Sequence, residues 1–192
     1  MKKALCVAMA LMMTASMSTA AFAEDAGSSV DNPIQFDYHD IDETVYDGVW
    51  YATGLGFDVY LPDTWTQAEL TDEMTEAGVA FMAGDEETGA NMVISVGELP
   101  EEAKDYDLEQ LGVELAASNT TALYADLSGI PAVIFENDDT EISGFSMLTE
   151  TGYLISGVMS APRDVSYDDY GPFFYNMTLS ISPSEQAETE TE

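Results

Sequence analysis

The sequence predicts an α+β domain in which an antiparallel β-sheet is flanked by helices. Several short segments alternate apolar and polar residues with a period of two, which is typical of half-buried strands. Four of these segments follow one another with only short turns between them, and this spacing favours an antiparallel meander. Two other segments place apolar residues three or four positions apart, as amphipathic helices do.

The strands are predicted one by one from this alternation. In the segment 56–62, Phe57, Val59 and Leu61 fall on one face, and Pro62 ends the strand because proline cannot donate to a ladder. Strands at 79–83 and 91–96 flank a glycine- and acid-rich loop at 84–89 that suits a hairpin, and the meander strands are predicted at 121–127, 131–136, 141–149 and 153–159.

Two helices are predicted. Asp107 and Gln110 stand at capping-box spacing before three leucines that share one face (Leu108, Leu111 and Leu115), and this helix should lie against the sheet. The last helix is expected to start at Gly171–Pro172, with proline in the first helical position, and residues 167–170 are interpreted as the turn before it. The segment 69–77 fits either a helix or a loop.

Composition divides the chain into a leader, one domain and two tails. Lys2 and Lys3 precede an apolar run and small residues, the order of a secretory signal peptide, so we predict that residues 1–23 are cleaved after Ala23. Residues 24–33 and the acidic segment 184–192 lack apolar side chains and are expected to be disordered. Residues 34–183, about 150 in number, make one domain of ordinary size.

The leader predicts a secreted or extracytoplasmic protein with no stable membrane anchor after cleavage. Its apolar run is shorter than the roughly 20 residues that span a bilayer, and Cys6 lies too early in the leader to become a lipidated first residue. Cys6 is the single cysteine, so the mature chain is expected to contain no thiol and no disulfide.

The charge of the chain excludes several classes of function. Without Lys2 and Lys3, only Lys104 and Arg163 oppose 37 carboxylates, so the formal charge is 2 minus 37, or −35. Binding to nucleic acid or to anionic lipid depends on Lys and Arg, and two such residues cannot supply it. The negative charge makes copies of the chain repel one another, so we expect a monomer. The same charge suits a cation-rich exterior. The partner is expected to be an unknown protein or a cationic or neutral ligand.

Nucleophilic hydrolysis and transition-metal chemistry also lack their usual residues. The mature chain has one histidine, His39, which stands among aspartates before the first strand and is interpreted as solvated. No cysteine or second histidine accompanies it, and no glycine-rich phosphate loop follows a strand. No catalytic residue is therefore assigned.

Calcium is the one cofactor for which candidate ligands can be named. It takes six to eight oxygen ligands, and a tight turn after residue 135 would point several carboxylates outward together. The candidate ligands are Glu136, Asp138, Asp139 and Glu141. Acids on so acidic a chain also cluster by chance, and a second acid-rich stretch, 37–47, lacks the glycine of an EF-hand loop.

A carboxylate-dependent glycan hydrolase is the alternative function. Such an enzyme needs only two acids at a set separation, and one of them must have a raised pKa. The stretch 167–170, Tyr-Asp-Asp-Tyr, resembles a platform for sugars, although its plain interpretation is a turn. With so many carboxylates available, the sequence selects no pair.

The order of elements resembles that of the PsbP/Mog1-like family. The likeness covers about residues 45–182 and rests on three phrases: Gly56–Pro62 followed by Trp65, the step Gly129-Ile130-Pro131-Ala132, and the closing Phe173–Ile181 segment. The resemblance implies an α/β/α sandwich that acts as a binding or accessory scaffold, because the family shares no catalytic motif. Plant members assist photosystem II and eukaryotic members bind a small GTPase, and neither partner suits an exported bacterial protein. We therefore predict an exported, non-enzymatic binding module.

Overall fold

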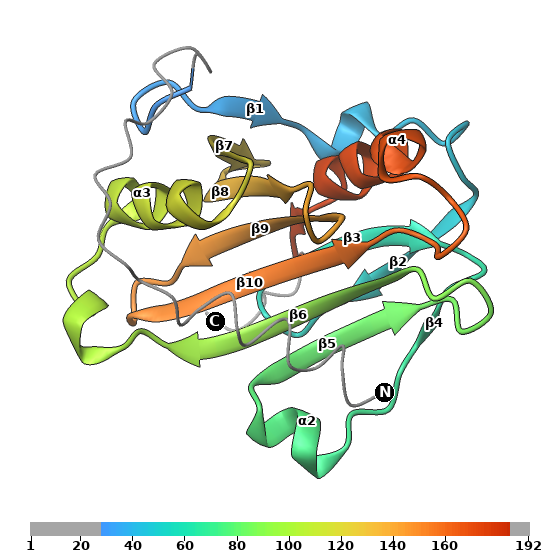
Figure 1. Cartoon of the computed structure of the whole chain (residues 1–192), viewed down its shortest axis with the longest axis horizontal. Helices are drawn as coiled ribbons and strands as arrows, with labels where there is room; N and C mark the ends of the chain where they lie inside the picture. The colour runs from blue at the N-terminus through green and yellow to red at the C-terminus, as the bar shows by residue number, and fades with distance from the viewer. Residues whose placement is uncertain (1–27, 185–192) are drawn as a thin grey trace, which may run out of the picture.

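A computed structural model describes residues 28–184 of the chain (Figure 1). The predicted signal peptide, and the acidic tail from residue 185 onward, lie outside the described residues. The strands are β1 (Ile34–Phe36), β2 (Gly48–Ala52), β3 (Phe57–Pro62), β4 (Thr66–Gln67), β5 (Val79–Gly84), β6 (Asn91–Glu98), β7 (Thr121–Leu127), β8 (Ile130–Asn137), β9 (Ile142–Leu148), β10 (Tyr153–Ser160) and β11 (Ser182–Pro183). The helices are α2 (Asp72–Glu76), α3 (Leu108–Ser118) and α4 (Tyr167–Leu179), with short 3-10 turns η1 (Tyr38–Asp40) and η2 (Glu101–Ala103).

The predicted α+β class is confirmed, and the four meander strands form the middle of a large sheet. This sheet has eight strands in the order β1-β7-β8-β9-β10-β6-β5-β4. All its neighbours run antiparallel except β1, which pairs in parallel with β7. The predicted hairpin is present as β5 and β6, and the undecided segment 69–77 contains the short helix α2.

The early strands do not join this sheet. β2 and β3 pair with each other, and β11 adds to the other side of β3, which gives a separate sheet in the order β11-β3-β2. The inward face of β3 is the one predicted, since Phe57, Val59 and Leu61 are buried. Tyr60, on the opposite face, is buried as well because the rings of Tyr46 and Trp50 pack against it.

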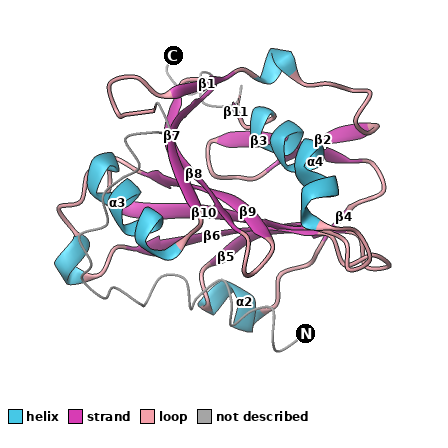
Figure 2. Cartoon of the chain, turned by 45° about the horizontal axis from the view of Figure 1, so that its top comes forward, coloured by secondary structure: helices cyan, strands magenta, loops and turns pink. Residues whose placement is uncertain are grey.

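The two faces of the large sheet carry different layers. Tyr124 and Val133 belong to one face and pack with Leu111 of α3. Leu127 and Phe145 belong to the other face, because side chains alternate along a strand, and they join the main core with α4 and the small sheet. Figure 2 shows α4 beside β2 and β3, away from α3. The result is a sandwich whose second sheet the sequence did not predict.

Helix α3 begins where the sequence predicts. The Asp107 side chain accepts a hydrogen bond from the Gln110 main-chain amide at 2.9 Å, and the Gln110 side chain accepts one from the Asp107 amide at 3.0 Å. This is the reciprocal capping box, which satisfies two amides that the helix itself leaves without a partner.

The predicted start of the last helix is wrong. Helix α4 begins at Tyr167, capped by Ser166, whose Oγ accepts from the Asp169 amide at 3.2 Å. Residues 167–170 are thus the first turn of the helix, and Pro172 lies inside it. The bulk of proline normally forces the preceding residue out of the helical region, but Gly171 has no Cβ to clash with the ring. The glycine therefore explains why the helix continues through the proline.

The described part of the chain begins before residue 34. Ser28 Oγ accepts a hydrogen bond from the Tyr124 amide at 3.1 Å, and Ser29 and Asn32 form a small bridge. These residues fall in the segment 24–33 that the sequence assigns to a linker. Within the described residues, no helix is long and apolar enough to cross a membrane.

Candidate functional site

Three distant segments meet in a hollow at the open end of the β2–β3 hairpin. Its volume is about 280 Å³. One wall comes from the residues around the hairpin ends, one from the β5–β6 loop, and one from the N-terminal half of α4. We call this hollow the acidic aromatic pocket; its lining residues are Tyr46, Asp47, Pro62, Asp63, Thr64, Trp65, Asp85, Thr88, Ala90, Pro162, Tyr170 and Phe173.

Stacked rings form one side of the pocket. Tyr170 and Phe173, one turn apart on α4, have ring centroids 4.6 Å apart and planes that differ by 5°. Tyr46 stacks on Phe173 at 5.5 Å and 18°, so Phe173 lies between two tyrosines. Tyr46 and Phe173 are half-buried, whereas Tyr170 is buried, so the exposed part of the stack belongs to Tyr46 and Phe173.

Tyr46 is held in this position by contacts from both sides. Its hydroxyl donates to the Tyr60 carbonyl oxygen at 2.9 Å. The buried amide of Asn176 accepts from the Asp42 main-chain amide at 2.8 Å and donates to the Asp42 carbonyl at 3.3 Å, which fastens the segment before Tyr46 to α4. Burial raises the pKa of Tyr46, so its phenol stays neutral and continues to donate.

Three carboxylates line the same pocket. Asp47 and Asp63 are exposed at the hairpin end, and Asp85 is half-buried in the β5–β6 loop. The Asp85 carboxylate accepts from the Thr88 hydroxyl at 2.8 Å and from the Glu87 amide at 2.9 Å. These hydrogen bonds, the one from Thr88 first, lower the pKa of Asp85, so this carboxylate carries a fixed negative charge.

The charge of Asp85 acts on the aromatic stack. The pKa of Tyr170 rises to about 12, mainly because the phenol is buried and secondly because Asp85 disfavours a second negative charge nearby. A negative potential therefore reaches the rings. A cation placed between them and the carboxylates would be favoured by the same potential.

Arg163 is a cationic side chain close to the pocket. Its main-chain amide donates to the Thr88 carbonyl at 3.1 Å, and its Nε would lie 3.0 Å from a Cβ built on Gly89. In the part of the chain that the structure describes, the ion pairs are Asp37–His39 and Glu101–Lys104, and neither involves Arg163. The guanidinium thus packs on the loop and, among the described residues, forms no ion pair with the pocket carboxylates.

The predicted calcium ligands lie elsewhere, around the β8–β9 turn. Glu136 belongs to β8, while Asp138, Asp139 and Glu141 follow it and are exposed. Desolvation first, and the charge of Asp138 second, raise the pKa of Glu136. Among the residues described, no three or more His, Cys, Asp or Glu side chains are grouped so that they could hold a metal ion. A calcium site at this turn remains a prediction.

Glu136 lines a second hollow, of about 140 Å³, between α4 and the face of β7 and β8. Its other walls are mostly apolar, with Leu123 and Ile134 from the sheet and Tyr175 from the helix. A single partly desolvated carboxylate gives this hollow little specificity compared with the three carboxylates and stacked rings of the acidic aromatic pocket.

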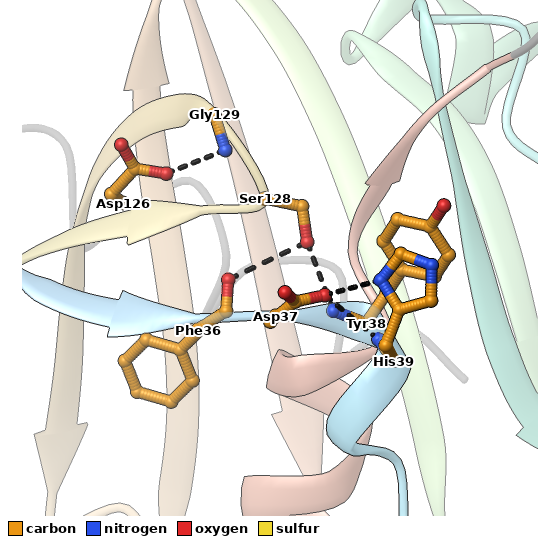
Figure 3. A network of polar contacts seen from close by, with 7 residues as sticks. All are labelled: Phe36, Asp37, Tyr38, His39, Asp126, Ser128 and Gly129. Carbon is orange, nitrogen blue, oxygen red and sulfur yellow. Dashed lines mark hydrogen bonds and ion pairs between the residues drawn. The ribbon is translucent and has the colours of Figure 1, made fainter.

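His39 is exposed, as the sequence predicts, and does not meet a serine. Its Nδ1 lies 2.7 Å from Asp37 Oδ1, and the side chains are 69% and 59% exposed. The nearby Ser128 Oγ accepts from the Tyr38 amide at 3.1 Å and bonds the Phe36 carbonyl, so it fastens β1 to β7 (Figure 3). Ser128 is engaged by the main chain and Asp37 is exposed, so these residues do not form a catalytic relay.

The acidic aromatic pocket was not predicted from the sequence, although several of its residues belong to segments that were singled out there. Trp65, Phe173 and Tyr170 appeared in motifs with no common location, and Asp85 appeared as a loop residue. A weak signal was the supply of tyrosines close to aspartates, as in Tyr46-Asp47. These residues come together only in the tertiary structure, and no regular spacing in the sequence indicates that they do.

Comparison with known proteins assigns no family to this chain. No family model matches the chain, and no curated protein matches it. Among solved structures, it is similar to a protein from Bacteroides thetaiotaomicron at 13% sequence identity and a TM-score of 0.40. The match covers 74% of this chain and 50% of that one, so the chain spans about half the length of that protein.

Proposed function

We propose that this chain is an exported, non-enzymatic binding domain whose acidic aromatic pocket holds an organic cation, such as an ammonium or guanidinium group. One observation carries the proposal: a three-ring stack and three carboxylates share a single hollow of about 280 Å³. That volume lies just below the range of about 300–1,000 Å³ for small-molecule sites. It suits a side chain or a head group rather than a large ligand.

The sign of the ligand charge follows from the residues in the pocket. The faces of aromatic rings carry negative potential, and cations within about 6 Å of a ring centroid are attracted to it. Asp47, Asp63 and Asp85 add full negative charges, and the whole chain carries −33. An anion near the pocket would be repelled, whereas a cation is attracted by the chain and then bound by the pocket.

An organic cation fits better than a metal ion. Calcium requires six to eight oxygen ligands at short distances, and the described residues offer no grouping of three acids that could hold a metal. Aromatic rings are not ligands for such ions, whereas they make favourable contacts with ammonium and guanidinium groups. The rings also pack against the main core, and at the pocket they offer favourable contacts to an organic cation and none to calcium.

The burial of the acids supports binding over glycan hydrolysis. A glycosidase needs a carboxylic acid whose pKa is raised into its working range by burial. The three pocket aspartates are exposed or half-buried, and Glu136, whose pKa desolvation raises, lies outside this pocket. The PsbP/Mog1-like relationship and export through the leader belong to the same proposal, and both are compatible with an accessory binding domain.

Calorimetric titration of the mature protein tests this function. We expect arginine amide and choline to bind, and acetate and glucose not to bind under the same conditions. Raising sodium chloride from about 0.05 to 0.5 M should weaken binding, because the Debye length becomes shorter as the salt concentration rises. Equal heats for all four compounds, or none for the cations, would contradict the proposal.

Three variants assign the binding to the pocket. Asp63→Asn should weaken arginine amide binding by about fivefold, the upper size of one exposed charge contact. Arg163→Gln should strengthen it, since a nearby like charge is removed. Asp105→Asn, in the loop before α3, makes the same charge change as Asp63→Asn and should leave the affinity nearly unchanged. If Asp105→Asn has the same effect as Asp63→Asn, the binding is non-specific.

A further inference from the structure

The small sheet ends in β2, whose outer edge pairs with no strand among the described residues, although the Gly48 amide there donates to the Tyr60 hydroxyl at 2.9 Å. In the described part of the chain, β2 pairs with β3 only, and β3 separates it from β11. The Asp63 amide donates to the Asp47 carbonyl, and the Thr53 amide donates to the Phe57 carbonyl, so alternate residues between them face β3. By the antiparallel pattern, the main-chain groups of Trp50 and Ala52 face away from β3. They form an available template for another strand.

The side chains of β2 do not protect this edge. The strand reads Gly-Val-Trp-Tyr-Ala and contains no charge or proline, the residues that usually block edge-to-edge pairing. Val49 is 44% exposed and Trp50 is 48% exposed. A large exposed tryptophan on an uncharged edge strand is typical of recognition surfaces, where aromatic residues supply much of the binding energy.

The edge is continuous with the acidic aromatic pocket. Asp47, which lines the pocket, immediately precedes Gly48, the first residue of β2. Successive residues of an extended strand advance by about 3.4 Å, so a chain paired with Trp50 and Ala52 reaches Asp47 within two or three residues. A single extended peptide can therefore touch both features.

Charge selects the kind of peptide. A second copy of this chain would bring its own strong negative charge against Asp47 and Asp63, so pairing between copies is opposed. A basic segment is attracted by the same charges. We infer that the natural ligand is an extended basic peptide that adds a strand to β2 and places a lysine or arginine side chain in the acidic aromatic pocket. This inference rests on the proposed function, because the pocket supplies the cation site.

Each of the two tryptophans reports on one part of the inferred binding: occupation of the pocket or addition of a strand to β2. Trp65 lines the pocket, and Trp50 lies on the edge strand. The probe is an eight-residue peptide of alternating valine and lysine, with arginine amide as the ligand for the pocket alone. In the Trp50→Phe variant, both ligands should change the fluorescence of Trp65. In the Trp65→Phe variant, only the peptide should change the fluorescence of Trp50, and circular dichroism checks that this variant is folded.

Main-chain pairing is tested on the protein and on the peptide. Ala52→Pro removes an outward amide at the edge and should weaken the peptide by about tenfold, with no effect on arginine amide. Ala52→Ser keeps the amide and is the matched control. Two peptides are compared, one methylated on the odd-numbered main-chain nitrogens and one on the even-numbered ones. Only one of them should bind about tenfold more weakly than the unmethylated peptide, since only one set of amides faces β2.

Each outcome is decisive for the strand-addition mode. Tighter binding of the peptide, lost in Ala52→Pro, supports it. Equal affinity of peptide and arginine amide overturns strand addition and leaves the pocket function standing. Failure of both ligands to bind overturns the pocket function as well. A dimer in sedimentation that Ala52→Pro dissociates would overturn the inference by showing that a second copy occupies the edge.

Discussion

Asp47 and Asp63 stand opposite each other at the open end of the β2–β3 hairpin, where the Asp63 amide donates to the Asp47 carbonyl at 2.9 Å. Both carboxylates line the acidic aromatic pocket. Like charges directly opposite on an antiparallel pair are destabilising, typically by a few tenths of a kcal/mol to about 1 kcal/mol. Stability alone does not explain why two aspartates occupy this pair, and the proposed cation between them would offset their repulsion.

Asp47→Asn should therefore stabilise the fold while it weakens the site. We expect the free energy of unfolding to rise by about 0.5 kcal/mol in urea denaturation at low salt. The affinity for arginine amide should fall in the same variant. Asp105→Asn serves as the control, because any gain it shows measures the general relief of negative charge. A loss of stability in Asp47→Asn would contradict the opposed-charge interpretation.

The melting temperature should depend on salt throughout the molecule. With a net charge of −33, neighbouring carboxylates repel one another, and added salt screens this repulsion over a length of about 8 Å at physiological ionic strength. The melting temperature at pH 7 should rise as sodium chloride increases from low to moderate concentration. Calorimetric scans at several concentrations measure it, and a flat or falling curve would argue against net repulsion.

Calcium and magnesium should stabilise the protein equally. The β8–β9 turn carries Asp138, Asp139 and Glu141, but the described residues present no grouping of three acids that could hold an ion. At equal ionic strength, millimolar calcium should shift the melting temperature no more than magnesium does. A larger shift for calcium that disappears in Asp138→Asn would instead establish the predicted calcium site at this turn.

Alkaline pH should destabilise the protein through the buried tyrosines. The pKa of Tyr170 is about 10 in the unfolded chain and about 12 in the folded one, so the folded state keeps its proton longer. The unfolded state binds fewer protons between these values, and stability should fall as the pH rises from about 10 to 12. Melting temperatures of the wild type and Tyr170→Phe across this range check it. The variant should show a shallower fall, and parallel curves would exclude Tyr170 as a cause.

Much of the fold could be predicted because its signals are local. Alternation of side chains marks the meander and the β5–β6 hairpin, and the Asp107–Gln110 capping box marks the start of α3. The start of α4 differs from the prediction because Ser166, which caps the helix one residue before Tyr167, sets the first turn in place of Pro172. The small sheet was missed because β11 is only two residues long and pairs with β3 from the far end of the chain.

The candidate site could not be predicted, because each of its parts has an ordinary local explanation. Asp85 looks like a loop residue, and its hydrogen bonds to Thr88 and Glu87 do shape that loop. Phe173 looks like part of a core helix. Only the packing of α4 against the segment held by Asn176 brings Phe173 under Tyr46. That packing depends on contacts more than 100 residues apart in sequence, as the 134-residue separation of Asp42 and Asn176 shows.

The core between the sheets should be sensitive to added volume at Gly157 in β10. This glycine pairs with Phe145 of β9, and a Cβ on it would lie 2.3 Å from two atoms of the phenylalanine ring. Phe145 is fully buried and stacks edge-on against Phe57 of the small sheet at 6.1 Å, so its ring cannot move without disturbing that sheet. Gly157→Ala should therefore reduce the free energy of unfolding by about 1–3 kcal/mol.

Gly97→Ala is the matched control for this substitution. Gly97 lies in β6 of the same sheet, where a Cβ would meet no atom within 4 Å. Alanine there should be neutral or slightly stabilising, since it lowers the entropy of the unfolded chain without a clash. Urea denaturation of both variants makes the comparison. Equal stability of the two would show that the ring of Phe145 can yield, and that the packing between the sheets is looser than its burial indicates.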